Sequence, residues 1–184
     1  MLVTFALLIT LVSVMLLAVF AIILGIVCLD QLTKWLAFFY LRGEPSFPIW
    51  EDVLHFTYQT NRGAAFGMLS DSRWVFMITS TIAIVGILFY LIKYRPTNKL
   101  LVVSLAMIAG GGIGNMIDRV RLGFVVDFID FCAFPELWSW VFNIADAAVC
   151  VGAGLFILDL ILDTVKELRK QKAQATENDH GRNS

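Results

Sequence analysis

The sequence is short of charged residues, histidine and cysteine, and each shortage excludes a class of protein. Charged residues make up 16% of the 184 residues and apolar residues 59%. Soluble globular chains carry about 25% charged residues. The net charge is −1 and no basic run is interleaved with aromatic residues before the tail, so nothing indicates nucleic-acid binding. The apolar excess is typical of a chain whose surface faces lipid.

The histidines and cysteines are too few and too scattered for the common metal and nucleophile sites. The histidines are His55 and His180, so neither an HExxH zinc site nor a Gly-x-Ser-x-Gly elbow with a histidine partner is present. The cysteines, which fit neither metal-site spacing nor a disulfide framework, are Cys28, Cys132 and Cys150. We therefore expect no metal and no cofactor, and a hydrolase of this composition would use carboxylates.

Four apolar stretches are long enough to cross a membrane. A helix that spans a hydrocarbon core of roughly 30 Å needs about 20 apolar residues, and in lipid only a helix satisfies its own backbone hydrogen bonds. We predict spanning helices at about 5–29, 74–92, 100–117 and 137–158. The first stretch lacks a positively charged start and a small-residue cleavage pattern, so we interpret it as a retained helix and not as a signal peptide.

The positions of Lys and Arg predict the orientation of these helices. Basic residues favour the cytoplasmic side, and they are densest in the link after the second helix and in the C-terminal tail. Both termini should therefore be cytoplasmic. The segment at about 41–73 is then an extracytoplasmic excursion with a small β-rich element. Residues 173–184 are polar and expected to be disordered, which leaves 1–172 as one four-helix domain.

Polar residues interrupt the fourth apolar stretch, although such residues are costly inside a membrane. An aspartate at the centre of a spanning helix costs about 2.5 to 3.5 kcal/mol. Asp146 lies nine residues after Leu137, and Asn143 shares its helix face. Gly152 and Gly154 predict a close approach of another helix. Asp146 and Asn143 form either a hydrogen-bonded packing pair or part of a catalytic site.

The third stretch carries small and polar residues on one face. Gly111, Asn115 and Asp118 stand at i, i+4 and i+7, which is one stripe of a helix. Glycines in a stripe let another helix or a substrate backbone come close. A small-residue packing seam accounts for the glycine, but it does not account for the Asn, the Asp and the Arg119 that follow.

Two further aspartates, Asp127 and Asp130, lie among apolar and aromatic residues after the third stretch. They are either interfacial charges or one of them pairs with Asp146. Two close carboxylates in a low-dielectric site share one proton. The ionised member can then take a proton from water while the protonated member polarises a scissile carbonyl. The spacing does not decide between Asp127 and Asp130.

Two other polar motifs have plain structural interpretations. Asp30 and Lys34, at i and i+4 near the end of the first stretch, are typical of an interfacial ion pair. The segment 58–67 combines an amide, small residues and an aromatic residue, which is typical of a turn with a buried Phe.

Five blocks, in order between about Cys28 and Gly154, together resemble one family, the bacterial lipoprotein signal peptidases or signal peptidase II. The blocks are Asp30-Gln31-Leu32-Thr33-Lys34, Asn61-Arg62-Gly63-Ala64-Ala65-Phe66, Gly114-Asn115-Met116-Ile117-Asp118-Arg119, Gly123-Phe124-Val125-Val126-Asp127-Phe128 and Phe142-Asn143-Ile144-Ala145-Asp146. Each block is weak alone, but five in order on a four-helix frame are specific.

The resemblance implies an all-α membrane protein with four transmembrane helices, a small extracytoplasmic β-rich element (the β-cradle) and a short interfacial helix. It implies an aspartyl endopeptidase without a metal that removes signal peptides from diacylglyceryl-modified prolipoproteins and cuts N-terminal to the lipidated cysteine. The implied partners are these substrates, membrane lipid and globomycin-type inhibitors, and we expect a monomer. The implied location is the bacterial inner membrane, with the active site at the extracytoplasmic face.

The resemblance also assigns site residues by position. The catalytic pair would be Asp127 and Asp146, which favours Asp127 over Asp130. The substrate-binding residues would be Asn61, Gly63, Ala64, Asn115, Arg119, Phe142 and Asn143. The structural or supporting residues would be Asp30, Lys34 and Asp118.

Two other functions fit part of the pattern. A transporter or channel subunit would use Asp118, Asp127 and Asp146 as proton or cation sites, but four spans are few and the two halves show no broken-helix symmetry. A protease that cuts transmembrane helices themselves would resemble a Gly-x-Gly-Asp pattern, whereas here Gly112 and Gly114 are followed by Asn115.

Overall fold

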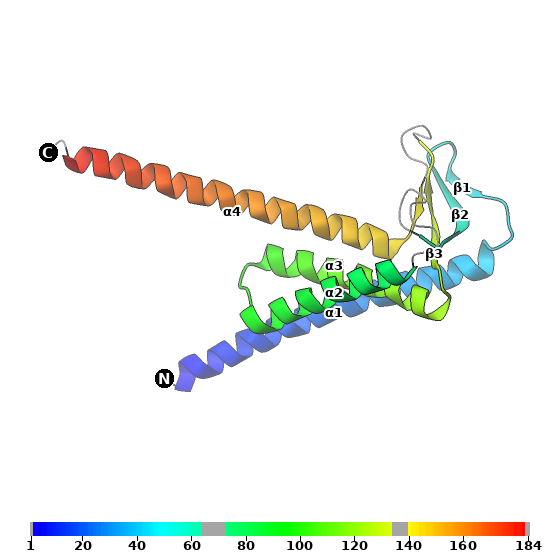
Figure 1. Cartoon of the computed structure of the whole chain (residues 1–184), viewed down its shortest axis with the longest axis horizontal. Coiled ribbons are helices and arrows are strands. Elements are labelled where there is room, and N and C mark those ends of the chain that lie inside the picture. The colour runs from blue at the N-terminus through cyan, green and yellow to red at the C-terminus, as the bar shows by residue number, and fades with distance from the viewer. Residues whose placement is uncertain (1, 64–72, 134–139, 183–184) are drawn as a thin grey trace.

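Four long helices and a four-stranded antiparallel sheet make up the computed structural model, which describes residues 2–63, 73–133 and 140–182 (Figure 1). The helices are α1 (Leu2–Tyr40), α2 (Arg73–Tyr94), α3 (Lys99–Arg121) and α4 (Ile144–Arg182). The strands are β1 (Phe47–Trp50), β2 (Leu54–Asn61), β3 (Val125–Phe131) and β4 (Val141–Phe142). The sheet stands at one end of the helices, and both chain termini lie at the other end (Figure 1).

Each helix contains a segment long and apolar enough to cross a membrane, which confirms the predicted fold class. The segments are Ser13–Tyr40, Trp74–Tyr94, Lys99–Arg121 and Ile144–Gln174. Large apolar side chains on α1 and α2 point outward, and Leu17 and Ile82 are about two-thirds exposed, at 66% and 67%. Exposed apolar surfaces of this extent are typical of helices that face lipid. The described residues contain no fifth helix, so the short interfacial helix stays a prediction.

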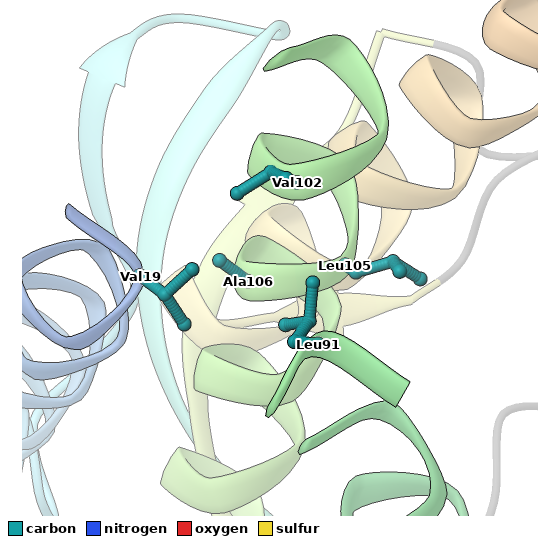
Figure 2. Close-up of a cluster of buried hydrophobic side chains, with 5 residues drawn as sticks. All are labelled: Val19, Leu91, Val102, Leu105 and Ala106. Carbon is teal, nitrogen blue, oxygen red and sulfur yellow. The ribbon is translucent and has the colours of Figure 1, made fainter. Parts of the chain in front are cut away.

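The third helix, α3, is the centre of the bundle and packs against the other three helices. Near the end of the bundle away from the sheet, Val102, Leu105 and Ala106 of α3 form an apolar cluster with Val19 of α1 and Leu91 of α2 (Figure 2). All five side chains are buried, so this cluster joins three helices through one piece of core.

A polar contact joins α3 to α4 at the same end. Asn98 precedes α3, and its Oδ1 accepts hydrogen bonds from the backbone N–H groups of Leu100 and Leu101. This N-cap supplies an acceptor for two donors that have no partner inside the helix. The Nδ2 of Asn98 donates to Asp159 Oδ1 on α4 at 2.6 Å. One side chain therefore begins α3 and ties it to the neighbouring helix.

Glycines allow α3 to lie unusually close to its neighbours at the sheet end. A Cβ at Gly111 would overlap the carbonyl oxygen of Ala145, and a Cβ at Gly114 would lie 2.6 Å from Asp30 Oδ2. Gly111, Asn115 and Asp118, which form the predicted stripe, are all buried.

Two glycines of α4 are expected to lie in close contact with another helix, but only one of them does. A Cβ at Gly152 would lie 2.9 Å from the carbonyl oxygen of Ser104. A Cβ at Gly154 would meet nothing within 4 Å, so the prediction for Gly154 is wrong. The two residues are two positions apart and therefore face different sides of the helix.

The sheet has the strand order β1-β2-β3-β4, and β2 and β3 are its longest strands. Val126 and Phe128 of β3 are buried against Ala37, which lies on the last turns of α1. Partly buried aromatic residues of the sheet, including Phe56 and Tyr58, complete this second apolar cluster. The sheet is thereby fixed to the end of α1.

Two predicted helix boundaries are wrong. The first helix continues beyond residue 29 to Tyr40, because its last turns are held by the sheet and by buried polar contacts described below. The fourth helix begins at Ile144 and not near residue 137, since Val141 and Phe142 form β4. Asp146 therefore lies in the first turn of α4 and not deep within a membrane span.

The predicted disorder of residues 173–184 is also wrong for most of that segment, because α4 continues as a helix to Arg182. Two ion pairs at i, i+3 lie on the preceding turns, between Lys166 and Asp163 and between Lys170 and Glu167. Such exposed pairs stabilise a helix only weakly.

The close contact at Gly114 gives a stability prediction. We expect Gly114→Ala to lower the stability of the purified protein in detergent by about 1 to 3 kcal/mol, as overpacked cores do, because the new methyl group would lie against Asp30. Thermal unfolding followed by circular dichroism measures this. Gly86→Ala is the matched control, since nothing lies within 4 Å of its Cβ position. Equal melting temperatures for the two variants would contradict the packing described.

Candidate active site between the helices and the sheet

The fourth helix begins with a reciprocal cap that places Asp146. The Oδ1 of Asn143 accepts a hydrogen bond from the backbone N–H of Asp146 at 2.9 Å. In return, Asp146 Oδ2 accepts from the backbone N–H of Asn143 at 3.2 Å. This is a capping box, with an amide at the cap and an acid at the third helical position. It holds the Asp146 carboxyl at the start of α4, where the helix dipole is positive.

The Asp127 carboxyl lies against the same asparagine. Asp127 is on β3 and is 2% exposed. Its Oδ1 accepts from Asn143 Nδ2 at 2.6 Å, and its Oδ2 accepts from Asn61 Nδ2 at 3.1 Å. Asn143 therefore donates to Asp127 through its side chain and to Asp146 through its backbone. The structure brings together two acids that are far apart in the sequence.

Asn115 of α3 joins this pair to the rest of the bundle. Its Nδ2 donates to Asp146 Oδ1 at 2.7 Å. Its Oδ1 accepts from Asn143 Nδ2 at 3.1 Å and from Lys34 Nζ at 2.9 Å. The amide is thus oriented by donors on one side and by a carboxylate on the other.

Lys34 lies between two buried carboxylates. Its Nζ is 2.9 Å from Asp30 Oδ2 and 3.2 Å from Asp118 Oδ2, and all three side chains are no more than 4% exposed. The expected interfacial pair of Asp30 and Lys34 is therefore a buried triad that includes α3. We call Asp30, Lys34 and Asp118 the ion triad.

Each carboxylate of the ion triad also holds the backbone next to one of the paired acids. Asp30 Oδ1 accepts from the backbone N–H of Ala145 at 2.9 Å, immediately before Asp146. Asp118 Oδ2 accepts from the backbone N–H of Val126 at 3.0 Å, immediately before Asp127. Because Lys34 contacts both carboxylates, the triad fixes the starts of α4 and β3 relative to each other.

Gln31, which had no predicted role, binds the ion triad through Asp118. Its Nε2 donates to Asp118 Oδ1 at 3.0 Å and to the carbonyl oxygen of Gly114 at 3.2 Å. A neutral amide beside Asp30 at the end of an apolar stretch is the signal that could have found it. Gln31 satisfies the Asp118 oxygen that Lys34 does not reach.

Burial and a neighbouring charge change the titration of Asp127. Burial raises the pKa of Asp127 to about 7, and the negative charge of Asp146 adds to the effect. The hydrogen bonds from Asn61 and Asn143 and the charge of Lys34 act in the opposite direction. A carboxyl group with this pKa can hold a proton at neutral pH beside a charged partner, as required for an acid and base that share one proton.

Asp130, the other candidate partner of Asp146, lies in a different place. It follows Asp127 by three residues on the same strand, so the two side chains point to opposite faces of the sheet. Its Oδ2 accepts from the Thr57 hydroxyl at 2.9 Å. The geometry therefore pairs Asp146 with Asp127.

The remaining predicted site residues differ in how they contact the paired acids or their neighbours. The backbone N–H of Gly63 donates to Asn61 Oδ1 at 3.0 Å, which turns the amide nitrogen of Asn61 toward Asp127. Arg119 stacks over the Phe76 ring at 5.6 Å and interacts electrostatically with both paired acids.

Phe142 lies in β4 immediately before the capping Asn143 and is half-buried. Ala64, also predicted to bind substrate, lies outside the described residues.

Possible metal ligands gather at a different place on the sheet. Within the described ranges, one group of three side chains could hold a metal ion together, because their ligand atoms all lie within 4.8 Å of one another. The group is His55, Asp130 and Cys132. It includes neither Asp127 nor Asp146. The chemistry available at the pair is that of two carboxyl groups and the amides around them.

Comparison with known proteins finds a family by sequence and a similar fold by structure. A family model described as signal peptidase (SPase) II matches residues 22–162. A protein of Halalkalibacterium halodurans named lipoprotein signal peptidase is 40% identical over 150 residues, which cover 82% of this chain and 96% of that protein.

Two solved structures have a similar fold, and both are described as bacterial membrane enzymes determined by the in meso method. The first, at 2.3 Å resolution, is 34% identical in sequence and has a TM-score of 0.74. The match covers 80% of this chain and 89% of the chain in that structure. The second, at 1.9 Å resolution, is also 34% identical, with a TM-score of 0.70 and coverage of 78% and 92%.

The ion triad gives a second prediction. We expect Lys34→Met to cost about 3 to 5 kcal/mol of stability, because removing one member of a buried ion cluster leaves unpaired buried charge. Thermal unfolding in detergent measures the loss. Lys166→Met removes an exposed pair with Asp163, in which the two side chains are 64% and 56% exposed, and should change little.

The triple variant Lys34→Met, Asp30→Asn, Asp118→Asn separates charge from packing. It removes the unpaired charges, so part of the lost stability should return. A Lys34→Met protein as stable as the unchanged chain would show that the triad does not hold this part of the fold together.

Proposed function

Because this chain belongs to the signal peptidase II family, we propose that it removes signal peptides from diacylglyceryl-modified prolipoproteins by cutting N-terminal to the lipidated cysteine. It would do so as an aspartyl endopeptidase in a bacterial inner membrane. The observation that carries the proposal is the joint contact of Asp127 and Asp146 with Asn143.

The two acids have unequal surroundings, and this difference supports a division of roles. Asp127 is buried and its pKa is raised to about 7, which suits the protonated member of the pair. Asp146 is less buried and accepts two N–H bonds at the positive end of α4, surroundings that stabilise a carboxylate. We assign Asp127 as the acid and Asp146 as the base.

The reaction then follows from these roles. Asp146 takes a proton from a water molecule, and the water oxygen attacks the carbonyl carbon of the scissile peptide bond. Asp127 donates its proton to the carbonyl oxygen as the tetrahedral intermediate forms. When the C–N bond breaks, the leaving amine takes a proton from Asp146, and the intermediate's hydroxyl returns a proton to Asp127. Both carboxyl groups return to their starting protonation states, and none of these reaction steps requires a metal.

The surface near the site suits a substrate anchored in lipid. Trp35, Tyr40 and Trp50, at the sheet end of α1 and on β1, are each more than half exposed. Exposed Trp and Tyr are typical of the membrane–water interface. If these residues lie at the membrane–water interface, the acid pair lies near the same depth in the membrane. A lipidated cysteine at the end of a membrane-inserted signal peptide would lie at this depth too.

The distribution of basic residues supports an extracytoplasmic position for the sheet. Lys93, Arg95 and Lys99 lie where α2 joins α3, which is the end of the bundle opposite the sheet (Figure 1). Since basic loops favour the cytoplasm, that end and both termini would be cytoplasmic. A monomeric state and inhibition by globomycin-type peptides are further predictions of this assignment.

A transporter would need Asp118 as an available proton or cation site. Lys34, Gln31 and the backbone of Val126 all bind its carboxyl group. The contacts of Asp118 therefore favour a structural role, and we retain the peptidase proposal.

The acid pair leads to a prediction for catalysis. Asp127→Asn and Asp146→Asn should each reduce cleavage of a lipidated prolipoprotein in detergent by at least about 10² to 10⁴-fold, the usual contribution of an acid or base. Folding, checked by circular dichroism, should persist. Asp130→Asn is the control on the same strand and should keep its activity. Activity near normal in either paired variant would reject the mechanism.

The pKa of Asp127 leads to a prediction for pH dependence. Asp127 must hold its proton, so kcat/KM should fall as the pH rises through about 7. Asn61 donates to Asp127 and stabilises its charged form, so Asn61→Leu should raise this pKa and move the alkaline limb of the profile to higher pH. Asp163→Asn, on the exposed face of α4, is the control. If the alkaline limb of the kcat/KM profile stays in place or moves to lower pH in Asn61→Leu, Asp127 is not the protonated acid.

A further inference from the structure

A second cluster of reactive side chains lies on the sheet, apart from the acid pair. His55 of β2 is the register partner of Asp130 on β3, and Cys132 follows two residues later. Residues two apart on extended chain point to the same face, so the three side chains converge. Their potential ligand atoms all lie within 4.8 Å of one another. We call His55, Asp130 and Cys132 the sheet cluster.

The imidazole of His55 has an unused polar atom. Its Nε2 is buried, and no group in the described part of the chain forms a hydrogen bond with it. A buried polar atom without a partner costs about 1 to 3 kcal/mol. Such an atom in a native fold calls for an explanation, and an unoccupied ion site is one of the recognised explanations. A neutral imidazole nitrogen is also a common metal ligand.

The carboxylate of Asp130 is oriented by groups behind it. Thr57 donates to its Oδ2 at 2.9 Å, and the hydroxyl of Ser46 lies 2.5 Å from that of Thr57. Since the Thr57 proton points to Asp130, Ser46 donates to Thr57. Hydrogen bonds of this kind orient metal ligands in known sites and contribute to their affinity.

Negative charge near Cys132 favours a bound cation. The carboxyl groups of Asp130 and Asp52 act electrostatically on the Cys132 thiol. A metal ion would be attracted by these negative charges, and it would displace the thiol proton into solvent as the metal–sulfur bond forms.

We propose that the sheet cluster is a binding site for a divalent transition metal, with Zn²⁺ as the preferred ion. The donors would be an imidazole nitrogen, a carboxylate oxygen and a thiolate, a mixed set that suits zinc and leaves a fourth position for water. Ligand atoms on one tetrahedral zinc lie roughly 3.3 to 3.8 Å apart. The ligand atoms therefore need to approach one another by at most about 1.5 Å, which small rotations about the side-chain χ angles would provide.

Such a site would cross-link β2 to β3, on the opposite face of β3 from Asp127. The ion would stabilise the sheet and take no part in the acid–base step. The expectation of no metal came from sequence spacing, which cannot detect ligands brought together by strand pairing. This proposal does not depend on the proposed peptidase function.

Cobalt titration of the full chain tests the proposal. The protein is purified in detergent without a polyhistidine tag, in a Cys28→Ser, Cys150→Ser background, and is stripped with a chelator. We expect one equivalent of Co²⁺ to produce a sulfur-to-cobalt charge-transfer band, and Zn²⁺ to remove the band by displacing cobalt. Zinc should also protect Cys132 from alkylation by iodoacetamide.

Variants assign the ligands. Cys132→Ser should lose the charge-transfer band and His55→Ala should lose stoichiometric binding. Thr57→Val, which removes only the orienting hydrogen bond, should weaken metal affinity by roughly 10 to 100-fold. His180→Ala, at the chain's other histidine, is the matched control and should bind normally. Circular dichroism in each case verifies that the variant is folded.

Three results would overturn the proposal. The first is the lack of a charge-transfer band in the folded parent protein. The second is unchanged binding in folded Cys132→Ser or His55→Ala, which would indicate adventitious metal only. The third is alkylation of Cys132 in the folded parent protein that zinc does not slow, which would indicate that Cys132 is not a ligand.

Discussion

The ammonium group of Lys34, held between the carboxylates of Asp30 and Asp118, is the contact on which the rest of the site depends. Each carboxylate binds Lys34 and also a backbone N–H group, one at the start of α4 and one at the start of β3. A buried ion cluster contributes little net stability compared with apolar packing, but it strongly disfavours arrangements in which its charges are unpaired. The triad therefore defines where α4 and β3 begin relative to each other.

Two small sequence features make this arrangement possible. Gly114 leaves room for the Asp30 carboxyl beside α3, where any Cβ would overlap it. Asn143 follows the short strand β4 and caps α4, so one residue contacts both members of the acid pair. The result is a pair of carboxyl groups with different surroundings, one on a strand and buried, the other at the positive end of a helix.

The four membrane helices could be predicted from the sequence, because apolar length alone separates a spanning helix from other structure. The polar residues of the site could be found as costly exceptions within apolar stretches. The start of α4 was missed because a short apolar run such as Val141–Phe142 has no periodicity that distinguishes a strand from a helix. Spacing did not distinguish Asp127 from Asp130, because it does not show that the two side chains lie on opposite faces of β3.

Long-range contacts account for the remaining differences between the sequence-based predictions and the structure. The spacing of Asp30 and Lys34 is the same for an interfacial pair and for a buried triad, and only the position of Asp118 on α3 distinguishes them. The sheet cluster joins residues 55 and 132, and its convergence depends on the register of β2 with β3. Register is set by tertiary packing and turn geometry, and a single sequence carries little information about either.

X-ray diffraction at a resolution that shows ordered water tests the joint action of the two acids most directly. One water molecule should lie within about 2.6 to 3.2 Å of a carboxyl oxygen of both Asp127 and Asp146, with Asn143 in contact with both residues. Carboxyl groups that face away from each other, with separate water molecules and no common asparagine, would contradict it.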